Sequence, residues 1–308
     1  MQIQFINPLK RGFEHMKKAL FKPFQLRVWF VVGFTAFLAQ LTDCSGGNGG
    51  GSNSGNPDFD LGDIVNAPGE AMDWLADNPG WFIFIIFALF IVITIAVVLT
   101  WLSARGKLMF LHNVAHYQSE VTKPWHEYRS EGNSLFLWML GFGFISFLFI
   151  CLIMVLLFGI LSNIYWEEPP ASVIVFNFMG LGLFFLLTVA IISYISRFLN
   201  DFIVPIMYKH RISSFEAWSR YWNLLKKNFF SFILYGLFHL LISIIVGIAI
   251  VALGFLSCCT LFLPLMIPYI NVVVLLPVSY TMRAFSLEFL AQFGKDMELV
   301  PKLATKAK

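Results

Sequence analysis

The chain has 308 residues, of which 58% are apolar and only 13% charged, with a mean hydropathy of +0.75 and a formal net charge of +3. Soluble domains carry about 25% charged residues, so this composition excludes a soluble globular protein. We therefore expect an all-α integral membrane protein with a single membrane domain over residues 1–308, and we expect no nucleic-acid partner.

An amphipathic pattern opens the chain. Its apolar positions recur at three- and four-residue steps and are Leu9, Phe13, Met16, Leu20 and Phe24, with Lys10, Arg11, Lys17 and Lys18 outside that stripe. Basic helices of this kind lie in the headgroup plane and favour anionic lipids. A cytoplasmic partner protein could use the same face, so both interpretations stay open.

The first predicted span covers residues 27–42. It is short and contains Gly33 and Gln40, so it could be tilted, half-inserted or packed behind other helices. The Gly/Ser/Asn-rich stretch 43–60 that follows predicts a flexible extracytoplasmic loop. A lipoprotein cleavage site before Cys44 is the alternative, but Asp43 does not suit the residue before such a cysteine, and residues 1–43 are long for a signal peptide.

Residues 69–78 predict a short amphipathic helix on the outer surface, with Met72 and Trp74 toward lipid. Five further apolar runs of spanning length follow it, at residues 81–102, 135–161, 172–196, 229–256 and 260–282. The sequence therefore predicts six transmembrane helices. In the last run, Pro264, Pro268 and Pro277 remove backbone donors and predict kinks.

The basic residues predict the orientation. All 21 Lys and Arg fall before the first span, between spans two and three, between spans four and five, or after span six. The other three loops hold nine acids and no basic residue. By the positive-inside rule both termini, including a tail over 284–308, are expected in the cytoplasm.

Two spans end in the same way, which suggests an internal repeat. Ser193-Tyr194-x-x-Arg197 closes the fourth span and Ser279-Tyr280-x-x-Arg283 closes the sixth. We interpret the chain as three parallel hairpin units, at about 8–105, 122–197 and 213–283, each entered through a cytoplasmic amphipathic helix. In the third unit, Ser213 and Glu216 have capping-box spacing. Interfacial anchoring by Tyr194, Arg197, Tyr280 and Arg283 explains the motif without any ligand.

Few residues point to chemistry, because no predicted span has an acidic or basic residue near its middle. His112, His116 and Glu120 share a helical face with metal-compatible spacing, but a satisfied polar face is the favoured interpretation, and we expect neither a metal nor a cofactor. His239 and Asn271 lie near the middle of adjacent spans and could hydrogen-bond, most simply as a clamp between helices.

The cysteines leave one alternative open. Cys44, Cys258 and Cys259 are all expected near the outer face, where Cys44 could pair with either of the other two, while Cys151 is expected in lipid or helix packing. Adjacent cysteines in an apolar turn are more often buried thiols.

The opening NPLKRGFEHMKKALFKPFQLRVWFVVGFTAFLAQL, followed by a glycine-rich stretch and five more spans, resembles a bacterial family of uncharacterised polytopic inner-membrane proteins. It is more distantly similar to the membrane domain of some glycerophosphodiester phosphodiesterases, whose catalytic barrel has no counterpart in this chain. The resemblance therefore implies no catalytic residues.

Without a catalytic constellation, we expect no enzymatic activity. The predicted function is that of an oligomeric membrane component that organises lipids or partner proteins, with close helix contacts at Gly141, Gly143, Gly180, Gly182 and Gly247. A transporter or channel, with its path along the proline-kinked sixth span near His239 and Asn271, is the alternative.

Overall fold

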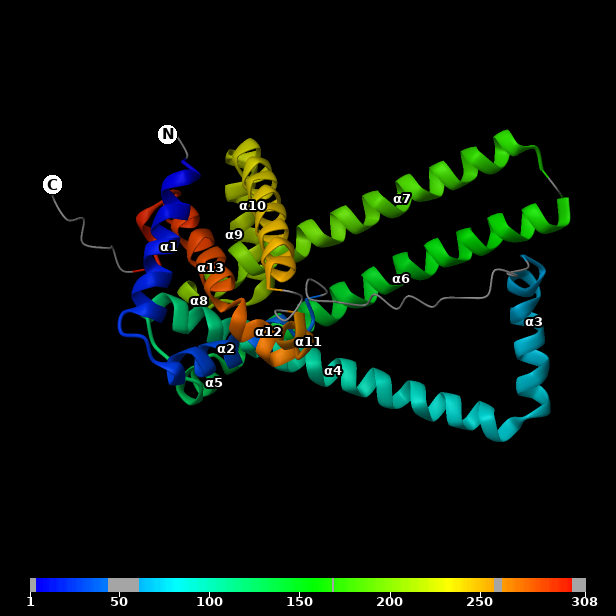
Figure 1. The fold of residues 1–308 in the computed structure, drawn as a ribbon, viewed down its shortest axis with the longest axis horizontal. Coiled ribbons are helices and arrows are strands. Elements are labelled where there is room, and N and C mark those ends of the chain that lie inside the picture. Colours follow the sequence, from blue (N-terminus) through cyan, green and yellow to red (C-terminus); the bar gives the residue numbers. More distant parts are fainter. Residues whose placement is uncertain (1–3, 44–60, 168, 258–261, 301–308) are drawn as a thin grey trace. The chain divides into compact units, whose positions relative to one another are not determined.

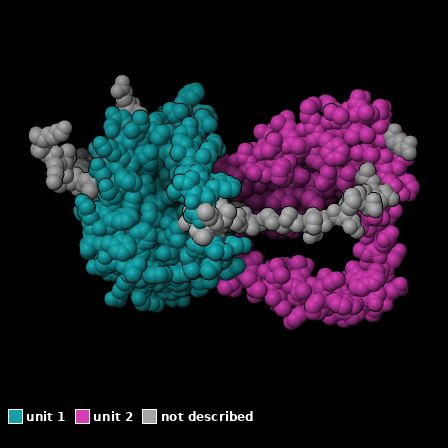
Figure 2. Space-filling view, viewed as in Figure 1, with its two compact units in different colours: residues 1–48, 99–139, 196–308 teal, residues 49–98, 140–195 magenta. Residues whose placement is uncertain are grey.

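The computed structural model describes residues 4–43, 61–167, 169–257 and 262–300, and within these ranges every regular element is a helix. The chain divides into two compact units, drawn in teal and magenta in Figure 2. Unit 1 comprises residues 1–48, 99–139 and 196–308, and unit 2 comprises residues 49–98 and 140–195. The all-helical class predicted from the sequence is confirmed.

Unit 2 is built from helices whose side chains are mostly exposed. It contains α3 (Leu61–Asp77), the first half of α4 (Pro79–His116), most of α6 (Arg129–Glu167) and most of α7 (Ala171–Phe198). The predicted outer helix over 69–78 is thus the second half of a longer helix, and it exposes Met72 and Trp74. Apolar side chains that no protein group covers have the surface expected of helices in lipid.

Among the described residues, four helices are long and apolar enough to cross a membrane: α4, α6, the continuous stretch Ala171–His210 that begins with α7, and α10 (Phe229–Leu256). A fifth crossing is counted if α12 (Pro268–Val274) and α13 (Leu276–Ala291), which meet at a bend of 62°, form one broken span. The apolar helix α2 (Leu26–Gln40) has 15 residues, or about 22 Å, and the hydrocarbon core is about 30 Å thick. A multi-pass membrane protein is supported, and six spans are not confirmed.

Several of these helices are much longer than a crossing requires. The 38 residues of α4 span about 57 Å, whereas about 20 residues suffice. Its apolar run ends where predicted, near residue 102, but the helix continues to His116, and residues 103–115 are buried. The excess length is what forms a packed core in unit 1.

The core of unit 1 gathers helix ends around α13, which Figure 1 shows beside α1 (Ile6–Phe21). The π-helical turn η2 (Leu199–Ile203), α8 (Val204–His210), α9 (Ser214–Lys227) and the first turns of α10 complete it, with α5 (Thr122–Glu127), α11 (Phe262–Met266) and η3 (Lys295–Met297) at its margins. Its largest buried side chains are aromatic: Phe202, Tyr221, Phe232, Tyr235, Phe285 and Phe289. Ser213 caps α9 as its position suggested, since its side chain accepts from the Glu216 backbone N–H.

The packing of α1 on α13 corrects the predicted amphipathic stripe. Met16 and Leu20 are buried as expected, but Phe13 is exposed and Phe24 lies beyond the helix end. The docked face instead includes Gly12, where an added Cβ would lie 2.9 Å from the Phe285 backbone nitrogen. Because glycine lets two helix backbones approach this closely, the contact face is rotated away from the one that apolar spacing predicted.

The five glycines predicted at helix contacts do not serve that purpose among the described residues. A Cβ at Gly141, Gly143, Gly180, Gly182 or Gly247 would meet nothing within 4 Å. Close approach occurs at Gly33 and Gly106 instead, and a Cβ at Gly106 would lie 2.6 Å from the Ala39 backbone nitrogen. Helix α2 therefore crosses the second half of α4 in direct backbone contact.

Proline shapes the last predicted span, as the sequence suggested. Pro268 lies in the first turn of α12 and Pro277 in the first turn of α13, while Pro264 lies within the short α11. Residues 262–282 are consequently divided among α11, α12 and the start of α13 rather than kinked within one helix, because Pro268 and Pro277 each start a new helix more readily than they continue an old one.

Candidate functional site

A network of charged and polar side chains is buried in unit 1. Its first member is Lys107 of α4, which is only 3% exposed and donates from Nζ to Asp43 Oδ1 at 2.7 Å and to Asn200 Oδ1 at 2.7 Å. Asn200 Nδ2 in turn donates to Asp43 Oδ2 at 3.3 Å. A buried ammonium group is tolerated only when it is paired in this way.

This ion pair corrects part of the predicted topology. The sequence placed Asp43 outside the cell, after the first span, and Lys107 in the cytoplasm, after the second. Two groups 2.7 Å apart cannot lie on opposite sides of a bilayer, so these two placements cannot both hold. The remaining residues of the predicted loop, 44–60, lie outside the described residues.

A second part of the network lies at the π-helical turn η2. This turn directs Asn200 and Asp201 to partners on α4, α10 and α13. Tyr235 donates to Asp201 Oδ2 at 3.1 Å, and Arg283 donates to the Asn200 carbonyl. Asp201 and Arg283 are each 8% exposed. Single π-helical turns are frequent at functional sites because they re-aim side chains.

Tyr280 and Arg283, predicted as interfacial anchors, are thus buried in protein. Tyr280 is 1% exposed and donates to the Val114 carbonyl at 3.2 Å. Both residues hold α13 against neighbouring elements, which differs from contact with lipid headgroups. Tyr194, in the other copy of the motif, is half-buried in α7.

His239 has partners other than the predicted one. Arg197 Nη1 donates to Nδ1 of the imidazole and lies 3.0 Å from Nε2, and the Ser243 hydroxyl lies 3.2 Å from Nδ1. Since a guanidinium group only donates, the imidazole must accept and is therefore neutral in this contact. Asn271 is half-buried in α12, and no hydrogen bond within the described ranges joins it to His239.

The predicted metal candidates lie together only in part. The rings of His112 and His116 stack at 4.7 Å, and both approach the Tyr208 hydroxyl, at 2.8 Å for His112 and 3.3 Å for His116. The backbone N–H of Glu120 donates to Asn113 Oδ1. In the part of the chain that the structure describes, no three His, Cys, Asp or Glu side chains are close enough to hold a metal ion.

A separate polar cluster fastens α1. Nε2 of the fully buried His15 lies 2.8 Å from Glu288 Oε1, and its Nδ1 contacts the Tyr117 hydroxyl. Arg11 adds an ion pair to the same carboxylate at 3.4 Å. Burial, reinforced by the negative charge of Glu288, raises the pKa of Tyr117 to about 12. Tyr117 therefore remains a neutral phenol at physiological pH.

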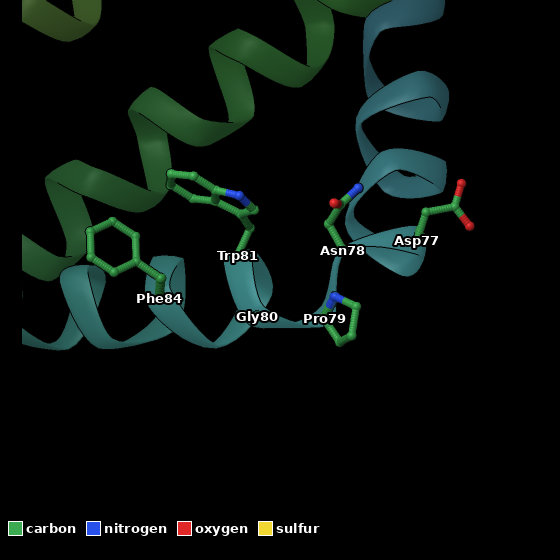
Figure 3. Close-up of a pocket in the computed structure, with 6 residues that line it drawn as sticks. All are labelled: Asp77, Asn78, Pro79, Gly80, Trp81 and Phe84. Carbon is green, nitrogen blue, oxygen red and sulfur yellow. The ribbon is translucent and has the colours of Figure 1, made fainter.

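Unit 2 has an open pocket of about 530 Å³ at the turn from α3 into α4 (Figure 3). It is lined by Asp77, Asn78, Pro79, Gly80, Trp81 and Phe84. The ring centres of Trp74 and Trp81 lie 6.2 Å apart, and Asn78 Nδ2 donates to the Trp74 carbonyl at 2.8 Å. Tryptophan beside an apolar helix is typical of the membrane–water interface, so this corner fits a helix entering the bilayer.

The buried network can stabilise the packing of the helices, or it can line a polar path through unit 1. It contains the cations Lys107 and Arg283 and the carboxylates of Asp43 and Asp201. Sequence reasoning missed it, since each charge lies at the end of an apolar run and resembles an interfacial anchor. One signal was present: Asp201 is the single acid in the otherwise basic stretch 197–211.

Comparison with known proteins gives a family without a described activity. Residues 4–300 match the model of a family of unknown function, DUF7544. No curated protein and no solved structure matches the chain, and no link to glycerophosphodiester phosphodiesterases is shown. Because the match covers nearly the whole sequence, the chain is a member of the DUF7544 family.

Proposed function

We propose that this protein is a non-enzymatic, multi-pass component of the bacterial inner membrane that organises anionic lipids. We place both termini in the cytoplasm. Support for that orientation comes from the 21 Lys and Arg residues, all of which belong to unit 1 together with both termini. The Ser-Tyr-x-x-Arg spacing supports an origin from repeated hairpins, as a further part of the proposal.

The observation that carries the lipid proposal is the two-faced packing of α1. One face is docked on α13 through Gly12 and His15. The opposite face, at spacings of three and four residues, exposes Lys10, Phe13, Lys17 and Phe21, and Lys17 Nζ lies 5.6 Å from the Phe13 ring centre. We call these four residues the basic face of α1. Its mixture of ammonium groups and aromatic rings is the composition that binds anionic headgroups.

The experiment measures lipid selection in nanodiscs that contain equal amounts of phosphatidylglycerol and phosphatidylcholine. Native mass spectrometry should find phosphatidylglycerol enriched on the wild-type protein. Lys10→Gln/Lys17→Gln should reduce the enrichment by up to about fivefold per residue, since one basic side chain near an anionic surface contributes about 1 kcal/mol. The matched control, Lys10→Arg/Lys17→Arg, keeps both charges and should behave as wild type. Equal lipid occupancy in all three proteins would count against the proposal.

Association with further copies or with a partner protein is part of the same proposal. It is supported by the apolar surfaces of α6, α7 and α10, which have little covering within either unit. Lipid alone could cover these surfaces, so the deciding measurement is the mass of the particle in nanodiscs. A mass of one chain and no second protein would remove this part of the proposal.

A transporter or channel is the second candidate. It is favoured by the 62° break between α12 and α13 and by buried charges in the same unit, both of which are common where carriers bind substrate. A cysteine at Asn271, in a protein without its four native cysteines, reports on a water-filled path. Labelling by a membrane-impermeant thiol reagent would support transport, and complete protection would oppose it.

A further inference from the structure

Arg105 of α4 is a buried cation that forms no ion pair with a carboxylate among the described residues. The residue is 6% exposed, and its guanidinium carbon lies 4.4 Å from the ring centre of Trp101 and 4.8 Å from that of Trp125. The two indoles meet edge to face at 5.6 Å and 89°. The guanidinium thus contacts two aromatic rings, one from α4 and one from α5.

One buried nitrogen of this guanidinium has no hydrogen-bond partner. Nη2 donates to Asn133 Oδ1 at 3.2 Å, whereas the buried Nε has no partner among the described residues. The Nε–H group is therefore a donor that burial leaves unsatisfied. Cation–π contacts offset only part of the cost of burying a charge.

The surroundings add positive charge rather than negative. Arg129, an exposed residue at the start of α6, lies close enough to repel Arg105, and no ion pair to either arginine occurs among the described residues. Glu127 and Glu131, the two acids nearest to Arg129 in sequence, both pair with Arg211 instead, the latter at 3.4 Å. The other buried cations of unit 1 differ, since Lys107 has Asp43 and Arg283 lies near Asp201.

We propose that Arg105, Arg129 and Asn133, with the indoles of Trp101 and Trp125, form a binding site for the phosphate group of a phospholipid headgroup. Arg105 lies three residues beyond the apolar run of α4, at the depth where headgroups begin. Guanidinium groups bind phosphate oxygens in a bidentate manner, and paired arginines without acids favour an anion. The inference rests on the proposed function and names one site within it.

The test compares phosphatidylglycerol retention after purification in a non-ionic detergent, measured by native mass spectrometry. Arg129→Gln is the main variant, because Arg129 is exposed and its loss leaves the packing intact. Arg105→Lys keeps the positive charge but loses the planar guanidinium group, which can bind two phosphate oxygens at once. Arg220→Gln removes one exposed arginine from α9, where Arg220 is paired with Glu216, and is the matched control. Circular dichroism and thermal melting check that every variant is folded.

Both site variants should bind phosphatidylglycerol about tenfold more weakly than Arg220→Gln does, equivalent to about 1.4 kcal/mol. A glucosyl diacylglycerol, which has no phosphate, should not be retained. If free glycerol phosphate displaces the lipid from the wild type, the site accepts a soluble phosphate as well. Equal retention by all three variants would overturn the site. Because the test of the proposed function alters Lys10 and Lys17, either idea can fail without the other.

Discussion

Asp43→Asn is expected to be among the most destabilising single changes in unit 1. The substitution leaves the Lys107 ammonium, which is 3% exposed, with only amide oxygens as partners. Removing one partner of a buried ion pair costs about 3–5 kcal/mol. Lys107→Met should cost less, because the Asp43 side chain is 27% exposed and retains contact with Asn200 and with solvent.

The assay is thermal unfolding in detergent. For a domain of this size about 1 kcal/mol shifts the midpoint by roughly 2–4 °C, so Asp43→Asn should lower it by about 10 °C. The double variant Asp43→Asn/Lys107→Met should be more stable than Asp43→Asn alone, with a coupling of about 1–3 kcal/mol. Arg220→Gln, which breaks an exposed pair at 3.2 Å, should change stability by less than about 1 kcal/mol.

Purely additive effects of Asp43→Asn and Lys107→Met, each below about 1 kcal/mol, would refute the reasoning. Such a result would mean that the two groups do not meet in the folded protein. The conflict between the ion pair and the predicted topology would then disappear, and α2 could be considered again as a full crossing.

Three further predictions concern packing, pH and orientation. Gly12→Ala should lower the thermal midpoint, because the added Cβ would lie 2.9 Å from a backbone nitrogen. Gly180→Ala, whose Cβ would meet nothing within 4 Å, should be neutral or stabilising. Equal effects of the two variants would contradict the contact of α1 with α13. The Tyr117 phenol has a pKa raised to about 12 in the folded state, so its stabilising effect should be complete below pH 10 and lost as the pH rises through 12. A melting series should show this loss in the wild type and a smaller loss in Tyr117→Phe, because the other buried tyrosines remain. Single cysteines at Lys10 and Lys123 should react with an impermeant maleimide only in inside-out vesicles, and one at Asp63 only in right-side-out vesicles; any reversal would refute that part of the orientation.

Local features of the sequence predicted much of the fold. The span 229–256 coincides with α10, the Ser213 cap forms, and the prolines of the last span divide it. Each of these outcomes depends on interactions within about four residues, or on the transfer of an apolar run into lipid. The same local rules could not show that α4 continues beyond its membrane-spanning segment into the packed core of unit 1, because helical hydrogen bonds are the same in both parts.

The candidate sites were beyond such rules. Lys107 and Asp43 are 64 residues apart, and His239 meets Arg197 across 42 residues instead of the expected Asn271. In the sequence Arg105 follows an apolar run, as interfacial anchors do. Only the tertiary structure brings the ring of Trp125, from another helix, to its guanidinium group. Which glycines allow close approach likewise depended on a facing backbone, so Gly12 and Gly106 could not be distinguished from Gly141 or Gly180.

By itself the amino-acid sequence determined that this protein is helical and multi-pass, because the apolar runs are long enough to span and too apolar for water. Only the tertiary structure decided which charged groups are buried together and which remain without a counter-ion. The physical reason is that burial of a charge is tolerable only with a particular partner at hydrogen-bond distance, and that partner is supplied by the packing of distant helices.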